Sequence, residues 1–131
     1  MTIVDSSAWI DFLRGAGGVT RALRSLLEEK AELAITDVVL MEVLAGARDD
    51  AERNRLRRFL YAQQFLPVEG PADYESAAEL HRLCRRGGRT PRNLVDCLIA
   101  VVAIRNDAEL LTADVDFQVI ARYAPLRLTA T

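Results

Sequence analysis

The chain has 131 residues, half of them apolar, which predicts one domain able to bury a core without disulfides or structural metals. Its net charge of −2 excludes the strongly basic composition that is the simplest sign of nucleic-acid binding. The longest apolar run, Cys97 to Ile104, is far shorter than the roughly 20 residues that span a bilayer, so we expect no membrane partner. Neither Cys84 nor Cys97 has CxxC spacing, and no signal peptide precedes them, so we expect a cytoplasmic protein.

Apolar periodicity and helix-ending residues predict the elements of the first half of the chain. Gly15, Gly17 and Gly18 end the first helix, and Gly46 closes the third, which Asp37 is expected to cap. In chain order we expect a strand over residues 2–4, helices over 8–13 and 21–29, a buried strand over 33–36, a helix over 38–46 and an exposed amphipathic helix over 49–61.

In the second half, prolines and glycines mark the boundaries. In chain order we expect a short strand or extended link over residues 65–68, a helix from 72 to about 86, a helix from about Arg92 to Arg105, a strand over 109–112, a short helix over 116–123 and a last strand over 126–128. Strands that alternate with helices of this length predict an α/β fold with a mostly parallel sheet covered on both faces. In such sheets, ligands bind beyond the carboxyl ends of the strands.

Four acidic residues interrupt segments that otherwise have core composition. Asp5 ends the first strand, Glu42 lies within VVLMEVLAG, Asp96 lies within NLVDCLIAVVAI, and Asp114 follows the late strand in ELLTADVDF. Burying a carboxylate costs several kcal/mol, and gathering several adds repulsion, so a cation is the expected compensation. The sequence therefore predicts an acidic metal site.

The positions of these acids in the predicted elements suggest that they converge. Asp5 and Asp114 follow strands at the carboxyl edge of the sheet, while Glu42 and Asp96 lie in the first half of helices that leave it. We expect their carboxyl groups within about 10 Å of one another. Oxygen-only ligation suits Mg²⁺ or Mn²⁺ rather than zinc, and such ions activate water for phosphodiester hydrolysis. His81 is the only histidine, which argues against a histidine-rich centre.

Three further residues flank these acids and have two possible roles each. The hydroxyls of Ser7 and Thr112 are predicted to orient ligands or water, although helix capping and turn formation would also explain them. Asp116 is either an outer metal ligand or the N-cap of the helix that begins near Phe117.

Arginine supplies all the basic residues except Lys30, and two clusters lie at residues 53–58 and 82–92. A GC-rich genome and solvated helix faces would explain both clusters. The second cluster shortly precedes the predicted acidic cleft, which makes Arg86, Arg89 and Arg92 candidates for binding an RNA backbone.

Four segments, IVDSSAWIDFL, TDVVLMEVLAG, NLVDCLIAVVAI and LLTADVDFQVI, occur in an order and spacing that resemble the PIN-domain ribonucleases, and more narrowly the VapC toxins of bacterial type II toxin–antitoxin pairs. In that family four acids line a Mg²⁺/Mn²⁺ site that hydrolyses RNA, and by motif they correspond to Asp5, Glu42, Asp96 and Asp114. Asp116 matches the second acid of the closing Asp-x-Asp-Phe pattern. Ser6 stands where the family usually has threonine.

The resemblance also implies the overall architecture and the partners. It implies a single domain over residues 1–131, folded as a three-layer α/β/α sandwich. It further implies an RNA substrate, a homodimer, and inhibition by a cognate VapB-type antitoxin whose C-terminal segment covers the groove.

Three alternatives fit the same class of fold. A receiver-like signalling domain, the main alternative, would be a non-catalytic Mg²⁺-binding interaction domain. It needs adjacent acids after the first strand and a late lysine, but Asp5 stands alone and no lysine follows Lys30. A haloacid-dehalogenase-type phosphatase needs Asp-x-Asp where this chain has Asp5, Ser6 and Ser7. A PIN-like binding module without catalysis predicts loss of the acids, and all four are present.

Overall fold

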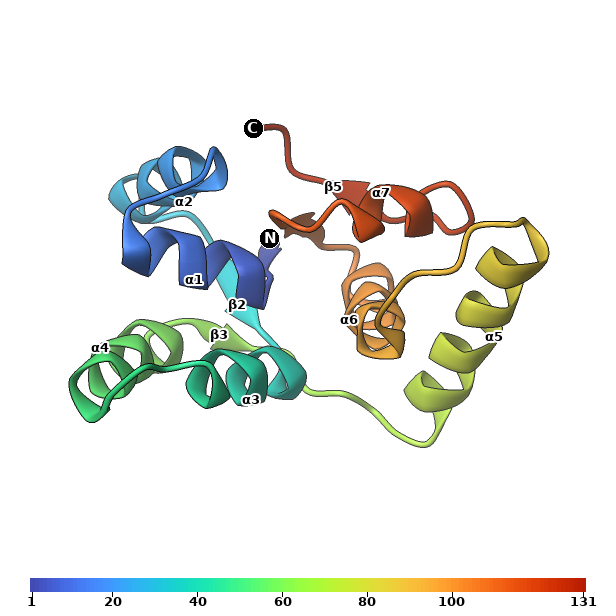
Figure 1. Ribbon diagram of the computed structural model, residues 1–131, viewed down its shortest axis with the longest axis horizontal. Coiled ribbons are helices and arrows are strands. Elements are labelled where there is room, and N and C mark those ends of the chain that lie inside the picture. Colours follow the sequence, from blue (N-terminus) through green and yellow to red (C-terminus); the bar gives the residue numbers. More distant parts are fainter.

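In the computed structural model, which describes residues 1–131, a five-stranded sheet separates two groups of helices (Figure 1). The strands are β1 (Thr2–Val4), β2 (Leu33–Ile35), β3 (Gln64–Phe65), β4 (Glu109–Leu111) and β5 (Arg127–Leu128). The helices are α1 (Ser6–Arg14), α2 (Val19–Glu28), α3 (Asp37–Ala45), α4 (Asp50–Tyr61), α5 (Ala72–Arg86), α6 (Leu94–Arg105) and α7 (Asp116–Ile120).

The strands are ordered β3-β2-β1-β4-β5, and every neighbouring pair is parallel. The chain moves outward from β1 to β2 and β3, then crosses back to β4 on the other side of β1. Because parallel crossovers are right-handed, this reversal sends the connecting helices to opposite faces of the sheet. Helices α1–α4 pack against one another on one side, and α5–α7 do so on the other (Figure 1). The predicted three-layer α/β/α sandwich is confirmed.

The core explains why such short strands hold the sheet together. Ile3, Val4, Leu110 and Leu111 are completely buried because helices cover both faces of the two central strands. Helix α6 is apolar on nearly all sides, and most of its residues are buried. Trp9 is also fully buried and belongs to the core. No helix in the chain combines the length and apolar character that crossing a bilayer requires.

Several predicted boundaries are wrong by a few residues, each for a local reason. Helix α6 begins at Leu94 instead of Arg92, because the Asn93 side chain caps it by accepting a hydrogen bond from the Val95 amide at 3.0 Å. The third strand is Gln64–Phe65, ahead of the predicted 65–68. Pro67, inside the predicted strand, has no backbone N–H to donate to a neighbouring strand.

The predicted cap at Asp37 is also wrong. Thr36 occupies the N-cap position, and Asp37 is the first residue of α3. Its Oδ1 instead accepts a hydrogen bond from the backbone amide of Val68 at 2.9 Å. The Asp37 carboxylate therefore ties the chain that leaves β3 to the start of α3.

Candidate metal centre

The pairing of β1 with β4 places Asp5 beside Thr112 at the carboxyl edge of the sheet. Val4 lies opposite Leu111 in the parallel register, so the next residue of each strand leaves the sheet at the same point. The Asp5 amide continues the pairing by donating to the Leu111 carbonyl at 2.9 Å. This edge lies at the switch point where the connecting helices change faces, the usual ligand position in open parallel sheets.

Two hydroxyls hold the Asp5 carboxylate in place. Ser7 Oγ donates to Asp5 Oδ2 at 2.7 Å, and Thr112 Oγ1 donates to the same oxygen at 2.9 Å. Asp5 is only 3% exposed, and this burial raises its pKa while the two hydroxyls oppose the shift. The Ser7 hydroxyl also accepts a hydrogen bond from the Ala113 amide, and it makes no helix-capping bond. Both hydroxyls therefore contact an acid of the predicted site.

Glu42 reaches the same edge from α3, which starts directly after β2. Ser6 Oγ donates to Glu42 Oε1 at 3.2 Å and lies 3.5 Å from Asp5 Oδ1, so one hydroxyl stands between the two carboxylates. Partial burial raises the pKa of Glu42, and the charges of Asp5 and Asp114 add to that shift. Ser6 is absent from the predicted site residues. The sequence did contain a signal for Ser6, because the family usually has threonine at this position. Serine and threonine both supply a hydroxyl there.

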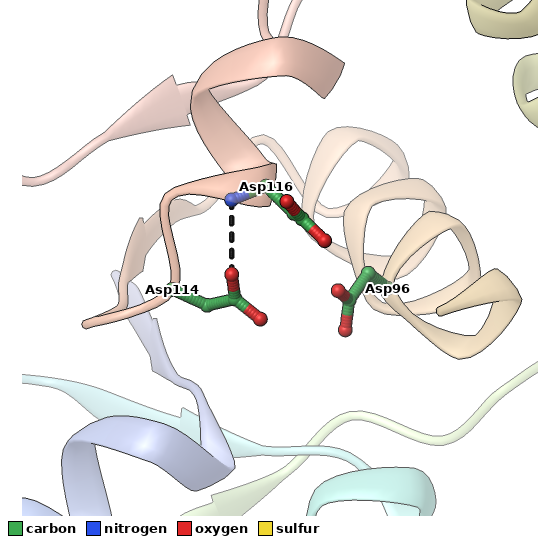
Figure 2. A group of neighbouring side chains, drawn as sticks. All are labelled: Asp96, Asp114 and Asp116. Carbon is green, nitrogen blue, oxygen red and sulfur yellow. Dashed lines mark hydrogen bonds between the residues drawn. The ribbon is translucent and has the colours of Figure 1, made fainter. Parts of the chain in front are cut away.

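Three aspartates form the densest part of the cluster (Figure 2). Asp96 lies in the first turn of α6, Asp114 in the loop after β4, and Asp116 at the start of α7. One carboxylate oxygen from each lies within 4.8 Å of the other two, and the three side chains point into a common space (Figure 2). The Asp116 amide donates to Asp114 Oδ1 at 2.9 Å, which fixes the orientation of that carboxylate.

Asp96 is the acid for which the fold provides least compensation. It is 5% exposed, and its Oδ2 is buried without any hydrogen-bond partner. Burial, followed by the charges of the other four acids, raises the pKa of Asp96 to about 7. The structure thus groups Asp96 with Asp114 and Asp116, and the charges of Asp5 and Glu42 also act on Asp96.

One of the two predicted roles of Asp116 is wrong. Its side chain makes no capping bond, and α7 begins at Asp116 itself. Asp116 Oδ2 instead accepts hydrogen bonds from the backbone N–H and from Nε of Arg92, both at 3.0 Å. The backbone bond and then the guanidinium lower the pKa of Asp116. The role as a metal ligand stays a prediction.

Among the three arginines predicted to bind RNA, only Arg92 contacts the acids. It pairs with Asp116 and lies 3.4 Å from Asp114. Arg86 lines a separate cavity between α5 and α6, together with Leu83 and Val101. Arg89 is exposed and forms no ion pair. Proximity along the chain to Asp96 was therefore an insufficient guide, because the turn after α5 separates these side chains.

The cluster suits a divalent cation. Every candidate ligand is a carboxylate oxygen, and the unpartnered Asp96 Oδ2 is the kind of buried polar atom that a cation would satisfy. The nearest sulfur in sequence, Cys97, is buried, which raises the pKa of its thiol to about 12 and keeps it protonated. The residues of this site could therefore hold a hard metal ion.

Fold and site together define a class of α/β protein that gathers carboxylates for a cation at the switch point of a parallel sheet. Comparison with protein families places the chain within one of them, because the PIN domain matches residues 2–123. The chain belongs to the PIN domain family. The resemblance seen in the sequence motifs is confirmed.

Named relatives cover nearly the whole chain. Ribonuclease VapC11 of Mycobacterium tuberculosis is 39% identical over 129 residues, which span 97% of this chain and 96% of the relative. Ribonuclease VapC19 of the same species is 35% identical over 118 residues, or 88% of this chain and 90% of the relative. The chain is therefore similar in both length and sequence to proteins named as VapC ribonucleases.

Solved structures show the same fold at lower sequence identity. VapBC2 of Rickettsia felis, bound to a promoter DNA fragment, gives a TM-score of 0.77 at 21% identity and covers 98% of this chain and 96% of its own. VapC20 of Mycobacterium tuberculosis, described as a sarcin–ricin loop cleaving toxin, gives a TM-score of 0.68 at 18% identity and covers 97% and 99%. These matches support the architecture independently of the motifs.

Proposed function

We propose that this chain is a metal-dependent endoribonuclease that hydrolyses RNA phosphodiester bonds as the toxin of a toxin–antitoxin pair. The observation that carries the proposal is the cluster of Asp96, Asp114 and Asp116, in which the buried Asp96 keeps an unpartnered oxygen, in a PIN-family chain. Asp5 and Glu42, bridged by the Ser6 hydroxyl, add their charges to the field at Asp96. Relatives 39% identical over nearly the full length are named as ribonucleases, which supports the same activity here. The comparisons support this function rather than the receiver-like alternative. We assign it to a single domain over residues 1–131.

The proposed metal ligands and catalytic residues are the acids that the sequence analysis selected. They are Asp5, Glu42, Asp96 and Asp114, with Asp116 as a fifth ligand. We propose Mg²⁺ or Mn²⁺ as the ion, because the donor atoms are all carboxylate oxygens. When bound, such an ion stabilises negative charge on the phosphate and lowers the pKa of water.

The chain itself supplies positioning and proton control. Ser7 and Thr112 hold Asp5, so that its second oxygen faces Ser6 and the cluster. Asp96, with a pKa of about 7, is partly protonated near neutral pH, and a bound cation would favour its ionised form. Glu42 is only half-buried, so a carboxylate oxygen that does not hold the ion is accessible to accept a proton from the attacking water.

We propose single-stranded RNA, or loops of structured RNA, as the substrate, because unstacked nucleotides enter an acidic cleft that a duplex cannot. The partner is a cognate VapB-type antitoxin, a proposal supported by the solved VapBC toxin–antitoxin structures that share this fold, and both act in the cytoplasm. A homodimer is supported by exposed apolar side chains at the α5–α6 surface, where Tyr74 and Leu94 are 58% and 56% exposed. They flank an apolar pocket that also includes Ala78 and Leu98.

The activity is tested by replacing single carboxylates with amides of the same shape. Asp5→Asn and Asp96→Asn should each reduce Mg²⁺-dependent cleavage of a single-stranded RNA by at least about 100-fold while the circular dichroism spectrum stays unchanged. Asp107→Asn is the matched control, because Asp107 precedes β4 at the amino-terminal ends of the strands, away from the acids, and its side chain is 96% exposed. Its backbone has a positive φ of 52°, which asparagine tolerates well.

Removal of the metal gives a second arm of the same experiment. The wild-type chain should lose cleavage in EDTA and regain it when Mg²⁺ or Mn²⁺ is restored. Full activity of Asp96→Asn, or undiminished cleavage in EDTA, would contradict the proposed mechanism.

A further inference from the structure

We infer that Arg92 is a phosphate-binding residue of this site, held in position by Asp116, and that it contacts the RNA phosphate beside the acid cluster. The inference rests on the proposed nuclease function and adds a residue that binds the substrate rather than the metal.

Arg92 is anchored far more firmly than an ordinary surface arginine. Its backbone N–H and its Nε both donate to Asp116 Oδ2 at 3.0 Å, and its Nη2 lies 3.4 Å from Asp114 Oδ1. The following residue, Asn93, caps α6, which fixes the backbone on the other side. A guanidinium held in this way loses little conformational entropy when it binds a ligand.

The anchoring leaves part of the guanidinium free. Nη1 has no partner in the protein, Nη2 has only the long contact with Asp114, and the side chain is 76% exposed. Arg105 provides the contrast, because its guanidinium is 29% exposed and is surrounded by Asp73, Glu69 and the Pro67 carbonyl. Arg105 is satisfied by the protein itself, whereas Arg92 still has donors that face solvent.

The position of these donors indicates what they bind. Arg92 is the only basic residue that pairs with any of the five acids, so its free N–H groups lie directly at the cluster. RNA brings one negative charge per phosphate toward a group of carboxylates, which repel it. A planar guanidinium forms two parallel hydrogen bonds with non-bridging phosphate oxygens. Arg92 thus offsets the repulsion and orients the phosphate at the acids.

Arg92→Ala tests this role, with Arg127→Ala as the matched control. Arg127 is also an exposed arginine paired with acids, Asp107 and Glu109, but it lies at the amino-terminal ends of the strands, whereas the acid cluster lies at their carboxyl ends. In single-turnover cleavage of a single-stranded RNA with Mg²⁺, Arg92→Ala should be slower by about 100-fold and Arg127→Ala unchanged. Arg92→Lys should recover only part of the loss, because lysine cannot form the paired hydrogen bonds.

Two further readouts separate phosphate binding from a structural or metal-related role. Mn²⁺ affinity measured by calorimetry should change less than about tenfold in Arg92→Ala, since the carboxylates remain and the lost hydrogen bond to Asp116 is offset by the removal of a nearby positive charge. Sulfur substitution of one non-bridging oxygen at the cleaved phosphate should slow the wild-type chain more than Arg92→Ala, for one of the two diastereomers, because only the wild-type chain has a contact to lose.

Three results would overturn the inference. They are cleavage by Arg92→Ala at the wild-type rate, an equal slowing of both proteins by sulfur substitution for both diastereomers, and Mn²⁺ binding that tightens more than tenfold in Arg92→Ala without slower cleavage. The last result would mean that Arg92 only substitutes for the cation. Failure of the nuclease proposal itself is recognised separately, because the wild-type chain would then not cleave RNA in the presence of Mg²⁺, or Asp96→Asn would cleave it at the wild-type rate.

Discussion

Asp96 should make the metal-free protein less stable as the pH rises. Its carboxyl group has a pKa of about 7 in the folded chain, against an ordinary value of 3.8, because it is buried among other acids. The folded state therefore holds the Asp96 proton more tightly than the unfolded state does. Below pH 4 both states are protonated and Asp96 has no effect, and stability is lost progressively as the pH rises toward 7.

The size of the effect follows from the same two pKa values. Their difference corresponds to about 4 kcal/mol of unfolding free energy at pH 8. Asp96→Asn keeps the shape of the side chain but cannot ionise, so the variant lacks this penalty. In EDTA the variant should be as stable as the wild-type chain at pH 4 and more stable by up to about 4 kcal/mol at pH 8.

Urea unfolding across this pH range, with and without Mg²⁺, measures the difference. At a free Mg²⁺ concentration of about 100 times its Kd, binding stabilises the wild-type chain by about 2.7 kcal/mol, and the variant should gain much less. Equal stability of the two proteins at pH 8 in EDTA would refute the idea that Asp96 is an uncompensated buried charge.

Three further changes test other parts of the structure. Thr112→Val removes a hydroxyl that lowers the pKa of Asp5, and it should weaken Mn²⁺ binding about tenfold in calorimetry at pH 7; unchanged affinity would contradict the role of the hydroxyl. Arg105→Ala leaves the buried Asp73 without its cation and should cost about 3 kcal/mol in urea unfolding at pH 7. Because Arg105 lowers the pKa of Asp73, the pair stabilises the fold above pH 4 and loses this effect as the pH falls, so a loss that is equally large at pH 3 would argue against the ion pair. Leu94→Arg places a charge on the exposed apolar surface of α6 and should convert a homodimer to a monomer, as measured by light scattering, without lowering the stability of the monomer. A dimer mass that stays unaltered in the variant would place the dimer contact elsewhere.

Much of the fold follows from local patterns along the chain. Alternation of apolar strands and amphipathic helices predicted the α/β class, and glycines and prolines placed most helix ends within a few residues. The error at Asp37 arose because two polar residues, Thr36 and Asp37, competed for one cap. The side chain of Asp37 instead bonds to a distant partner, the Val68 amide. Propensity alone does not contain that information.

The candidate acids were equally accessible from the sequence, because a carboxylate inside an apolar segment is costly wherever it lies. Asp5 directly follows one predicted strand and Asp114 lies two residues past another, and parallel strands bring their carboxyl ends to one edge. The type of metal also followed, since oxygen ligands favour hard cations. These conclusions needed only residue type and local position.

Tertiary structure decided which of these groups touch. The order of the strands sets β4 beside β1, which joins Thr112 to Asp5 across 107 residues of sequence. Packing of α3 against α1 brings Glu42 to Ser6, and the turn before α6 selects Arg92 from three similar arginines. The periodicity of apolar residues predicts which face of an element is buried but not which element covers it. The chemistry of the acids could therefore be predicted from the sequence, whereas their hydrogen-bonding partners depended on the fold.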